Sequence, residues 1–381
     1  MTFICVLILA VQMMNHNQGQ GGRGPSDKMM YDVGVIGSGL AGLAAARTLK
    51  TAGFTVIVLD KGRRIGGRMA TRRADGFLFN HGAQFVTART SAFSALCSEA
   101  AASGACAPWD IHHHSTAYSG RPAMRSLAEY LGQGCRVEQD FQLTSVDPAS
   151  DHLSLHGTGR DGAAHAPVIC RHLILTAPAP QTAQITASFC PEASHIASQA
   201  GYAPCWTVMF GYNRQIEPTF SVWRGTDDTL MGWISREQSR PHSHNRGSHN
   251  RGSDNSGSEL PQKTAFTLQL GAAASAAQLE QPAQLILSAA REAAKDEAGL
   301  SLPEADYSSA HRWRYAKVIQ PAPLSAPRLF PLRKPSSALL GLAGDWHPAP
   351  SEAGNRRAGQ RAEDAYLSGL AVAEELISLR R

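Results

Sequence analysis

The chain has 381 residues, which is too long for one small domain and enough for two domains with sizeable cores. Its formal net charge is only +5, and the basic residues are spread over several segments, so the composition does not indicate nucleic-acid binding. The seven cysteines are odd in number and scattered, without a CxxC pair, which argues against zinc and favours reduced thiols in the cytoplasm.

The first 28 residues are expected to lie outside the folded domains. Phe3–Met14 is apolar but too short to span a bilayer, and no lysine or arginine precedes it. Asn15–Lys28 is rich in Gly, Asn and Gln. We interpret residues 1–28 as a disordered or non-native extension, with translation beginning at Met29 or Met30. An export signal is the alternative.

A dinucleotide-binding unit follows. An apolar strand from Tyr31 enters the turn Gly37-Ser-Gly39-Leu-Ala-Gly42, a helix covers Ala41–Thr51, and a second strand, Val56–Asp60, ends on an acid. The glycines permit a tight turn, close approach to a pyrophosphate and helix packing, and the acid accepts from ribose hydroxyls. The predicted cofactor contacts of this unit are Gly37, Ser38, Gly39, Leu40, Ala41, Gly42, Asp60 and Lys61.

A second glycine pair, Gly66-Gly67, follows the ribose acid and favours FAD over NAD. This extension resembles the FAD folds of the glutathione-reductase type. The loop would pass over the pyrophosphate, with Arg68 donating to it. For the neighbouring Arg63, Arg72 and Arg73, a solvated loop is the alternative.

Further segments are similar to the rest of such an FAD domain. We expect a strand over Gly76–Phe79, a helix over Ser91–Ala102, hairpin strands over Arg136–Val146 and Leu153–Gly157, and an apolar strand over Leu173–Thr176.

A second domain is expected to begin near Thr182. Its predicted elements are strands Trp206–Gly211, Leu230–Ile234 and Ala265–Leu270 and a helix near Ala283–Ala298. Inside it, His244–Ser248 is repeated as His249–Ser253, which predicts a disordered insert over residues 242–260 and only weakly a histidine metal site.

The chain then returns to the first domain. A buried strand from Ala338 ends at Gly344-Asp345, and a helix covers Ala362–Leu379. The prediction is an α/β protein with a Rossmann-type, glutathione-reductase-like FAD-binding domain made of residues 29–181 and 333–381. Residues 182–332 would form a mixed-sheet substrate domain.

A set of short segments between residues 31 and 376 follows the pattern of one family. They are Gly66–Met69, His81–Arg89, Gly120–Met124, Ala177–Pro180, Trp206–Val208, Trp233–Arg236, His311–Ala316, Gly344–Trp346 and Leu367–Gly369. The chain thereby resembles the renalase family, most closely its bacterial branch, within the flavin amine oxidase-like group. The segments at His81 and His311 are the most specific.

The resemblance implies non-covalent FAD and an oxidase acting on misreduced dihydronicotinamide dinucleotides, the 2- or 6-dihydro isomers of NAD(P). Hydride would pass to flavin N5, and O2 would reoxidise the flavin, giving H2O2 and NAD(P)+. The expected partners are this dinucleotide and O2, without nucleic acid or membrane.

The resemblance also implies site residues. The further cofactor contacts are Gly66, Gly67, Arg68, Met69, Gly82, Ala83, Gln84, Val137, Ala177, Gly344, Asp345 and Ala362. Gln84, Trp313 and Arg314 would act in catalysis, and Trp206, Trp233, Arg236 and Tyr315 would contact substrate; no metal is expected. From the residues alone, core packing explains the aromatic side chains better, a salt bridge explains Arg236 and Arg314 at least as well, and a structural role explains Gln84 equally well. His81 and His311 suit structural roles because hydride transfer requires no base.

The chain departs from the family at three places. The family commonly has an acid at Asn80, a glycine at Ala123 and Asn-Arg at Glu237-Gln238. The missing arginine leaves the choice between NAD and NADP open. Two alternatives also remain: an FAD-dependent amine oxidase or desaturase with another substrate, and a flavin-binding protein without turnover.

Overall fold

The computed structural model describes residues 30–111, 116–217, 220–226, 229–241, 263–323, 329–332, 336–347 and 362–380. The predicted extension over residues 1–28 and the insert over residues 242–260 lie outside this part of the chain. Residues from Tyr31 onward form one compact unit. Within the described ranges no helix is long and apolar enough to cross a membrane.

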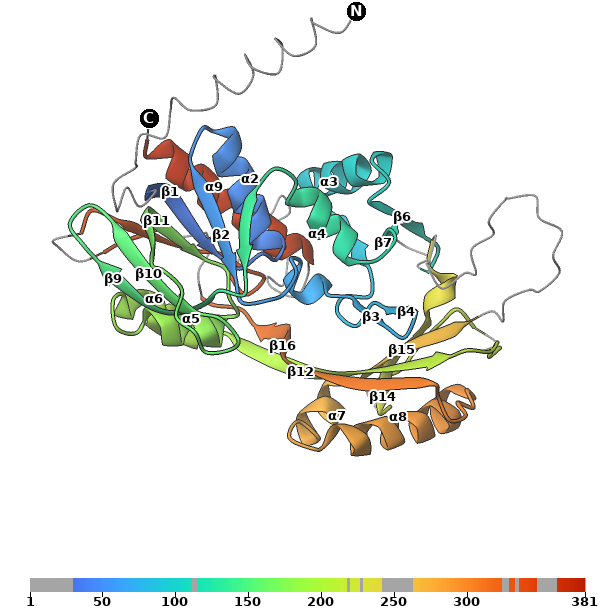
Figure 1. The fold of residues 1–381 in the computed structure, drawn as a ribbon. Helices are drawn as coiled ribbons and strands as arrows, with labels where there is room; N and C mark the ends of the chain where they lie inside the picture. Colours follow the sequence, from blue (N-terminus) through green and yellow to red (C-terminus); the bar gives the residue numbers. More distant parts are fainter. Residues whose placement is uncertain are drawn as a thin grey trace, which may run out of the picture. The chain divides into compact units, whose positions relative to one another are not determined.

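An eight-stranded mixed sheet carries the dinucleotide-binding unit (Figure 1). Its strands are β1 (Met30–Ile36), β2 (Val56–Asp60), β8 (Arg136–Gln139), β9 (Gln142–Pro148), β10 (Leu153–Thr158), β11 (Val168–Leu175), β17 (Leu329–Pro331) and β18 (Leu339–Leu342). The order is β17-β18-β11-β1-β2-β8, with the hairpin β9-β10 attached to β11. β1, β2 and β8 run parallel, as do β11 and β18.

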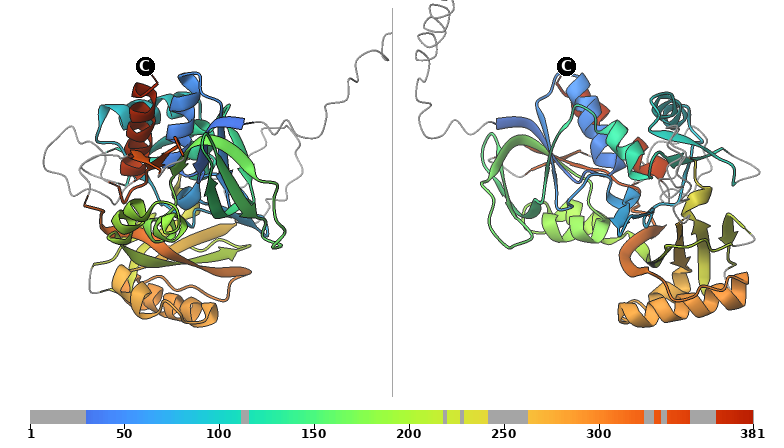
Figure 2. Two further views of the ribbon diagram at one scale, coloured as in Figure 1. Left: turned by 90° about the vertical axis from the view of Figure 1, so that its left-hand side faces the viewer. Right: turned by 45° about the vertical axis from the view of Figure 1, so that its right-hand side comes forward.

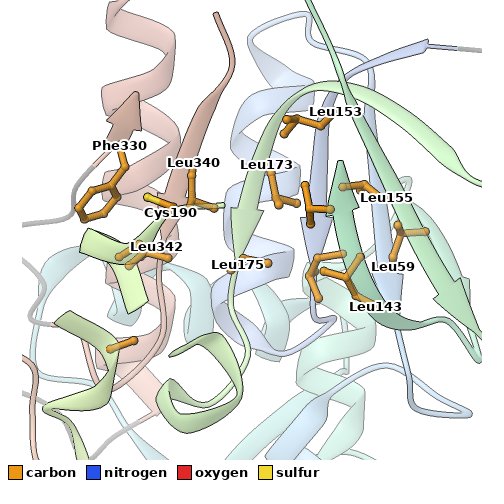
Figure 3. Close-up of a cluster of buried hydrophobic side chains, with 14 of the residues drawn as sticks. Leu59, Leu143, Leu153, Leu155, Leu173, Leu175, Cys190, Phe330, Leu340 and Leu342 are labelled. Atoms are coloured by element: carbon orange, nitrogen blue, oxygen red, sulfur yellow. The ribbon is translucent and has the colours of Figure 1, made fainter. Parts of the chain in front are cut away.

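Helices bury both faces of the central strands, which explains their nearly continuous apolar sequences. Helices α2 (Leu40–Thr51) and α9 (Ala362–Ser378) pack on one face, and α5 (Ala179–Thr186) and α6 (Pro191–Ser198) on the other. Side chains alternate accordingly: Ile174 packs in the core with α2 and α9, whereas Leu173 and Leu175 belong to the opposite core, shown in Figure 3.

A second sheet has five strands and is antiparallel throughout, where the sequence predicts a mixed sheet. It contains β12 (Gly201–Tyr212), β13 (Val222–Arg224), β14 (Met231–Arg236), β15 (Thr264–Leu270) and β16 (Tyr307–Gln320), in the order β13-β14-β15-β12-β16. Helices α7 (Ala272–Ala277) and α8 (Ala283–Ala298) cover one face (Figure 2).

Smaller elements complete the fold. They are the hairpin β3 (Arg72–Ala74) and β4 (Phe77–Phe79), the three-stranded sheet of β5 (Val86–Thr87), β6 (Cys106–Trp109) and β7 (Ala117–Gly120), helices α3 (Ser91–Ala102) and α4 (Arg125–Leu131), and the 3-10 turns η1 (Gly67–Met69) and η2 (Glu237–Ser239). Phe77 and Phe79 of β4 pack against Met209 and Tyr307, on the face of the second sheet away from α8.

Two local predictions need correction. The predicted hairpin strand Arg136–Val146 is wrong, because it is two strands: β8 pairs with β2, and β9 forms the hairpin with β10. The chain turns at Asp140, whose φ of 62° is in the left-handed region. The sequence reasoning also missed the long strand β16, because its mixture of basic and aromatic residues is only partly buried.

Glycine permits the close crossing of α2 and α9. A Cβ atom at Gly369 would overlap the backbone carbonyl oxygen of Ala41. The C-terminal helix therefore lies directly on the helix that follows the glycine-rich turn.

We predict that Gly369→Val lowers the free energy of unfolding by about 3 kcal/mol, because the helices must separate to admit the side chain. Glu374→Ala, at an exposed position of the same helix, is the control and should change it by less than about 0.5 kcal/mol. Denaturant titration of both variants measures the difference, and equal stabilities would contradict the close crossing.

Candidate cofactor and substrate site

A cavity of about 2530 Å³ extends from the glycine-rich turn after β1 to the second sheet. Its walls include the loop after β2, the loop after β4, and parts of β14, β15 and β16. Single small-ligand pockets usually measure about 300–1,000 Å³. The space is therefore sufficient for a dinucleotide cofactor together with a second ligand.

Most of the predicted site residues line this cavity. They are Gly37, Gly39, Leu40, Ala41, Asp60, Lys61, Gly66, Gly67, Arg68, Met69, Gly82, Ala83, Gln84, Ala177, Trp233, Trp313, Arg314, Tyr315, Gly344, Asp345 and Ala362. Ser38, Gly42, Val137, Trp206 and Arg236 do not line it.

The glycine-rich turn fits a pyrophosphate. Gly39 lines the cavity, and a Cβ atom there would meet no atom of the protein within 4 Å, so the backbone is open to a ligand. Gly42 has a different role, because its Cβ would overlap the carbonyl oxygen of Gly37. Gly39 therefore keeps space free for a ligand, and Gly42 allows α2 to begin against the turn.

Asp60 is fixed at the end of β2. Its Oδ2 accepts from the Ser38 amide at 2.6 Å and from Ser38 Oγ at 2.8 Å, and its Oδ1 accepts from the Gly62 amide at 2.6 Å. A carboxylate has about four acceptor positions, so capacity remains for a ribose hydroxyl. Ser38 thus acts on the site through Asp60.

Arg68 and Asp345 form a bidentate ion pair. The Nη1–Oδ2 and Nη2–Oδ1 distances are 2.6 and 2.7 Å. In the sequence-based prediction, Arg68 contacts the pyrophosphate of FAD and Asp345 contacts the cofactor. The pair joins the loop after β2 to the end of β18 beside the cavity.

The Gln84 amide is already fully hydrogen-bonded. Its Nε2 donates to the carbonyl oxygens of Asn80 and Gly82 at 2.7 and 3.1 Å, and its Oε1 accepts from Arg240 Nη2 at 2.6 Å and Ser235 Oγ at 3.1 Å. The side chain is 6% exposed. Gln84 therefore holds the loop after β4 in place. These contacts favour a structural role for Gln84 over a role in catalysis.

Arg240 and Glu237 are a buried ion pair that sequence reasoning missed. Arg240 Nε donates to Glu237 Oε2 at 2.7 Å, and the side chains are 3% and 1% exposed. The Arg240 guanidinium also lies 4.4 Å from the ring centre of Trp109. Breaking such a pair leaves a buried charge, which usually costs about 3–5 kcal/mol.

Two departures from the family pattern meet in this network. The side-chain Nδ2 of Asn80 donates to Glu237 Oε2 at 2.7 Å, and the backbone N–H of Asn80 donates to Glu237 Oε1 at 3.0 Å. The resemblance places the acid at position 80 and the asparagine at position 237. This chain has the two residue types exchanged across one contact, so a carboxylate and an amide are both kept.

An aromatic cluster lies where β16 borders the cavity. Trp313 stacks on His81 with ring centres 5.5 Å apart, and its Nε1 donates to the His81 carbonyl oxygen at 2.9 Å. His311 contacts both rings edge-on at 5.0 and 4.4 Å. Burial, then the neighbouring His311, Arg72 and Arg125, lowers the pKa of His81 to about 3. Burial and Arg72 also lower the pKa of His311, so both rings are neutral near pH 7.

Other predicted side chains point elsewhere. Trp206 Nε1 donates to the Gln278 carbonyl oxygen, and Arg236 lies 3.6 Å from Glu217. Arg314 borders the cavity but is half exposed and bidentate to Glu280 at 2.6 and 3.0 Å. Their predicted roles at the substrate are without support from these contacts.

The cavity is strongly basic. Its acidic lining residues are Asp60, Asp345 and Glu363, and its basic ones are Lys61, Arg63, Arg64, Arg68, Arg72, Arg73, Arg125, Arg160, Arg312, Arg314 and Lys317. Several of these are paired, as Arg68 is with Asp345. The remaining excess favours anionic ligands. Within the described ranges no cluster of His, Cys, Asp and Glu could hold a metal.

Comparison with known proteins agrees with the cofactor half of this site. The sequence profile of the NAD(P)-binding Rossmann-like domain matches residues 35–100. Putrescine oxidase of Kocuria rosea is 44% identical over 68 residues, which are 18% of this chain and 14% of that protein. A probable flavin-containing monoamine oxidase A of Dictyostelium discoideum is 37% identical over 70 residues, 18% of this chain and 15% of that protein. The chain thus matches less than a fifth of the length of these relatives.

Solved structures extend the likeness to the whole fold. A putative protoporphyrinogen oxidase from Exiguobacterium sp. 255-15 has a TM-score of 0.64 at 13% identity, covering 94% of this chain and all of that one (100%). A double mutant of putrescine oxidase has a TM-score of 0.60 at 13% identity, covering 92% and 99%. The predicted Rossmann-type α/β fold is confirmed.

The cofactor these likenesses indicate is FAD. The Gly39 opening and the anchored Asp60 fit its adenosine diphosphate half. A flavin-containing monoamine oxidase is among the relatives matched over this segment, and the solved structures, at 13% identity, show the fold alone.

We predict that Gly39→Val yields a folded protein without FAD. The backbone angles of Gly39, −77° and −177°, suit valine, and its side chain would occupy only ligand space. Gly42→Val is the matched control: it should lower the free energy of unfolding by about 3 kcal/mol, because its side chain meets the Gly37 carbonyl. Visible absorbance and thermal melts of both variants measure this. A yellow Gly39→Val protein would contradict the placement.

A second prediction concerns pH. Because the folded-state pKa of His81 lies near 3, below that of an unfolded histidine near 6.5, the unfolded state takes up the proton first. Its contribution to stability is therefore present above pH 6.5 and is lost as the pH falls toward 3, by at most about 1.4 kcal/mol per pH unit. Denaturant titrations of His81→Phe should show a weaker decline than wild type. His195→Phe, at an exposed site, should decline as wild type does.

Proposed function

We propose that the protein is an FAD-dependent oxidase of misreduced dihydronicotinamide dinucleotides, the 2- or 6-dihydro isomers of NAD(P). The observation that carries the proposal is the basic cavity, which is suited to a phosphorylated substrate. The segments that resemble the renalase family add to it, since those at His81 and His311 meet at the cavity wall. FAD binding is proposed for residues 29–181 and 333–381, and substrate binding for residues 182–332, of which α6 and β17 pack with the first sheet.

The chemistry asks the protein mainly to position one flat ring beside another. Bound FAD supplies a hydride acceptor at N5, and O2 then takes the two electrons with two protons, giving H2O2 and NAD(P)+. Gln84 and its partners fix the loop that contains Gly82 and Ala83. Trp313 is held by the His81 carbonyl and provides a rigid aromatic wall for the substrate ring.

Hydride loss from a dihydropyridine leaves an aromatic cation and releases no proton from the ring. The neutral state of His81 and His311 agrees with this, because neither ring needs to act as a base. Both are therefore proposed as walls of the site.

Amine oxidation is the second candidate, and the match to putrescine oxidase is the observation in its favour. Its substrates are cations at neutral pH, and the surplus of arginine and lysine would repel them. Charge therefore favours the dinucleotide.

We predict rapid bleaching of the flavin when the protein is mixed anaerobically with 2- or 6-dihydro-NAD or -NADP, and none with the ordinary 4-dihydro forms. Stopped-flow absorbance measures the rates, and admission of O2 should restore the spectrum with release of peroxide. Putrescine is mixed in parallel. Bleaching by putrescine alone would establish the amine reading, and no bleaching by any compound would favour a flavin-binding protein without turnover.

A further inference from the structure

Arg72 and Arg125 both line the cavity, and Arg125 lies across the Gly66-Gly67 loop from the glycine-rich turn. A Cβ atom at Gly67 would lie 3.4 Å from the Cα atom of Gly39, whereas one at Gly66 would lie 3.4 Å from Arg125 Cγ. The loop therefore separates Arg125 from the place proposed for the FAD pyrophosphate. Both arginines are partly buried.

Neutral groups hold these two guanidinium groups. Arg72 Nη1 donates to Ser309 Oγ at 2.6 Å and to the Tyr307 hydroxyl at 3.4 Å, and Arg125 Nη2 donates to the Thr71 carbonyl oxygen at 2.7 Å. Arg125 Nε is buried without a hydrogen-bond partner. In the part of the chain that the structure describes, neither forms an ion pair with an acidic side chain.

The positive potential of the pair reaches the aromatic cluster. Arg72 contributes to the lowered pKa of both His81 and His311, and Arg125 contributes to that of His81. Burial lowers the pKa of Arg125 itself, and Arg64 and Arg73 lower it further, which outweighs the opposing effect of Glu129. Both arginines therefore lie close enough to His81 to act on its charge, and Arg72 acts on His311 as well.

We propose that Arg72 and Arg125 form a second oxyanion subsite, separate from the FAD phosphate site, which binds the pyrophosphate of the dinucleotide substrate. The identity of that substrate rests on the proposed function. Two planar forks of N–H donors suit phosphate oxygens, and the buried, unpaired Nε of Arg125 is a donor that an anion would satisfy. The subsite would hold the substrate phosphates while its flat ring lies against Trp313.

The test uses the FAD-loaded protein and inorganic pyrophosphate as the probe, with calorimetry as the readout. Arg72→Gln and Arg125→Gln are each expected to weaken binding about tenfold or more while FAD content stays at the wild-type level. Arg72→Lys should retain most of the affinity because it keeps the charge. Arg214→Gln, whose guanidinium donates to the Glu304 carbonyl outside the cavity lining, is the control and should bind as wild type does.

Three results would overturn the proposal: no binding of pyrophosphate to the loaded wild type, unchanged binding in both glutamine variants, or loss of FAD from them. The last would assign the arginines to the cofactor. Because pyrophosphate binding needs no turnover, it can succeed when every dihydronicotinamide isomer fails to bleach the flavin. A failure of the proposed function is thereby distinguished from a failure of the subsite.

Discussion

The structure depends on backbone contacts that α2 makes at both of its surfaces. The helix touches the glycine-rich turn through Gly42 and the C-terminal helix through Gly369, and neither contact has room for a side chain. The first contact aims the start of α2 at the cavity. The second packs the C-terminal helix α9 against α2. Asp345 and Ala362 therefore reach the same cavity as Gly39.

This arrangement divides the cavity into regions with different chemistry. The end near β1 and β2 has exposed backbone and one anchored carboxylate, Asp60. The middle contains the Arg68–Asp345 pair, in which the charges cancel. The end near β16 has aromatic rings and Arg72, which donates to two hydroxyl groups. A molecule with a flat ring and phosphates matches that last region better than a small cation does.

The sequence pattern of the cofactor half is local, so it indicated which residues would lie together. The spacing from Gly37 to Asp60 lies within one βαβ unit, and the structure places most of these residues on the cavity. The predicted substrate residues are divided, because the contacts of that half join distant segments: Trp233 and Tyr315 line the cavity, and Trp206 and Arg236 do not. The sequence predicts both Trp206 and Trp313 in the site, but of the two only Trp313 lines the cavity. Side chains at alternate positions of a strand point to opposite faces of the sheet, and the sequence does not show which face borders the cavity.

The Glu237–Arg240 pair shows the same limit. No local pattern reveals that Glu237 would contact Asn80, 157 positions earlier in the chain. In the sequence, Asn80 and Glu237 are two separate differences from the renalase-family pattern, and only the fold shows that they compensate each other. Treating the two differences as a pair is what could have revealed the contact between them.

The Arg68–Asp345 ion pair affects the stability of the site when no cofactor is bound. Because Arg68 and Asp345 neutralise each other, a site without FAD contains no unpaired charge from these two residues, where the loop after β2 meets the end of β18. The ion pair therefore tethers the two chain segments by itself, independently of the cofactor.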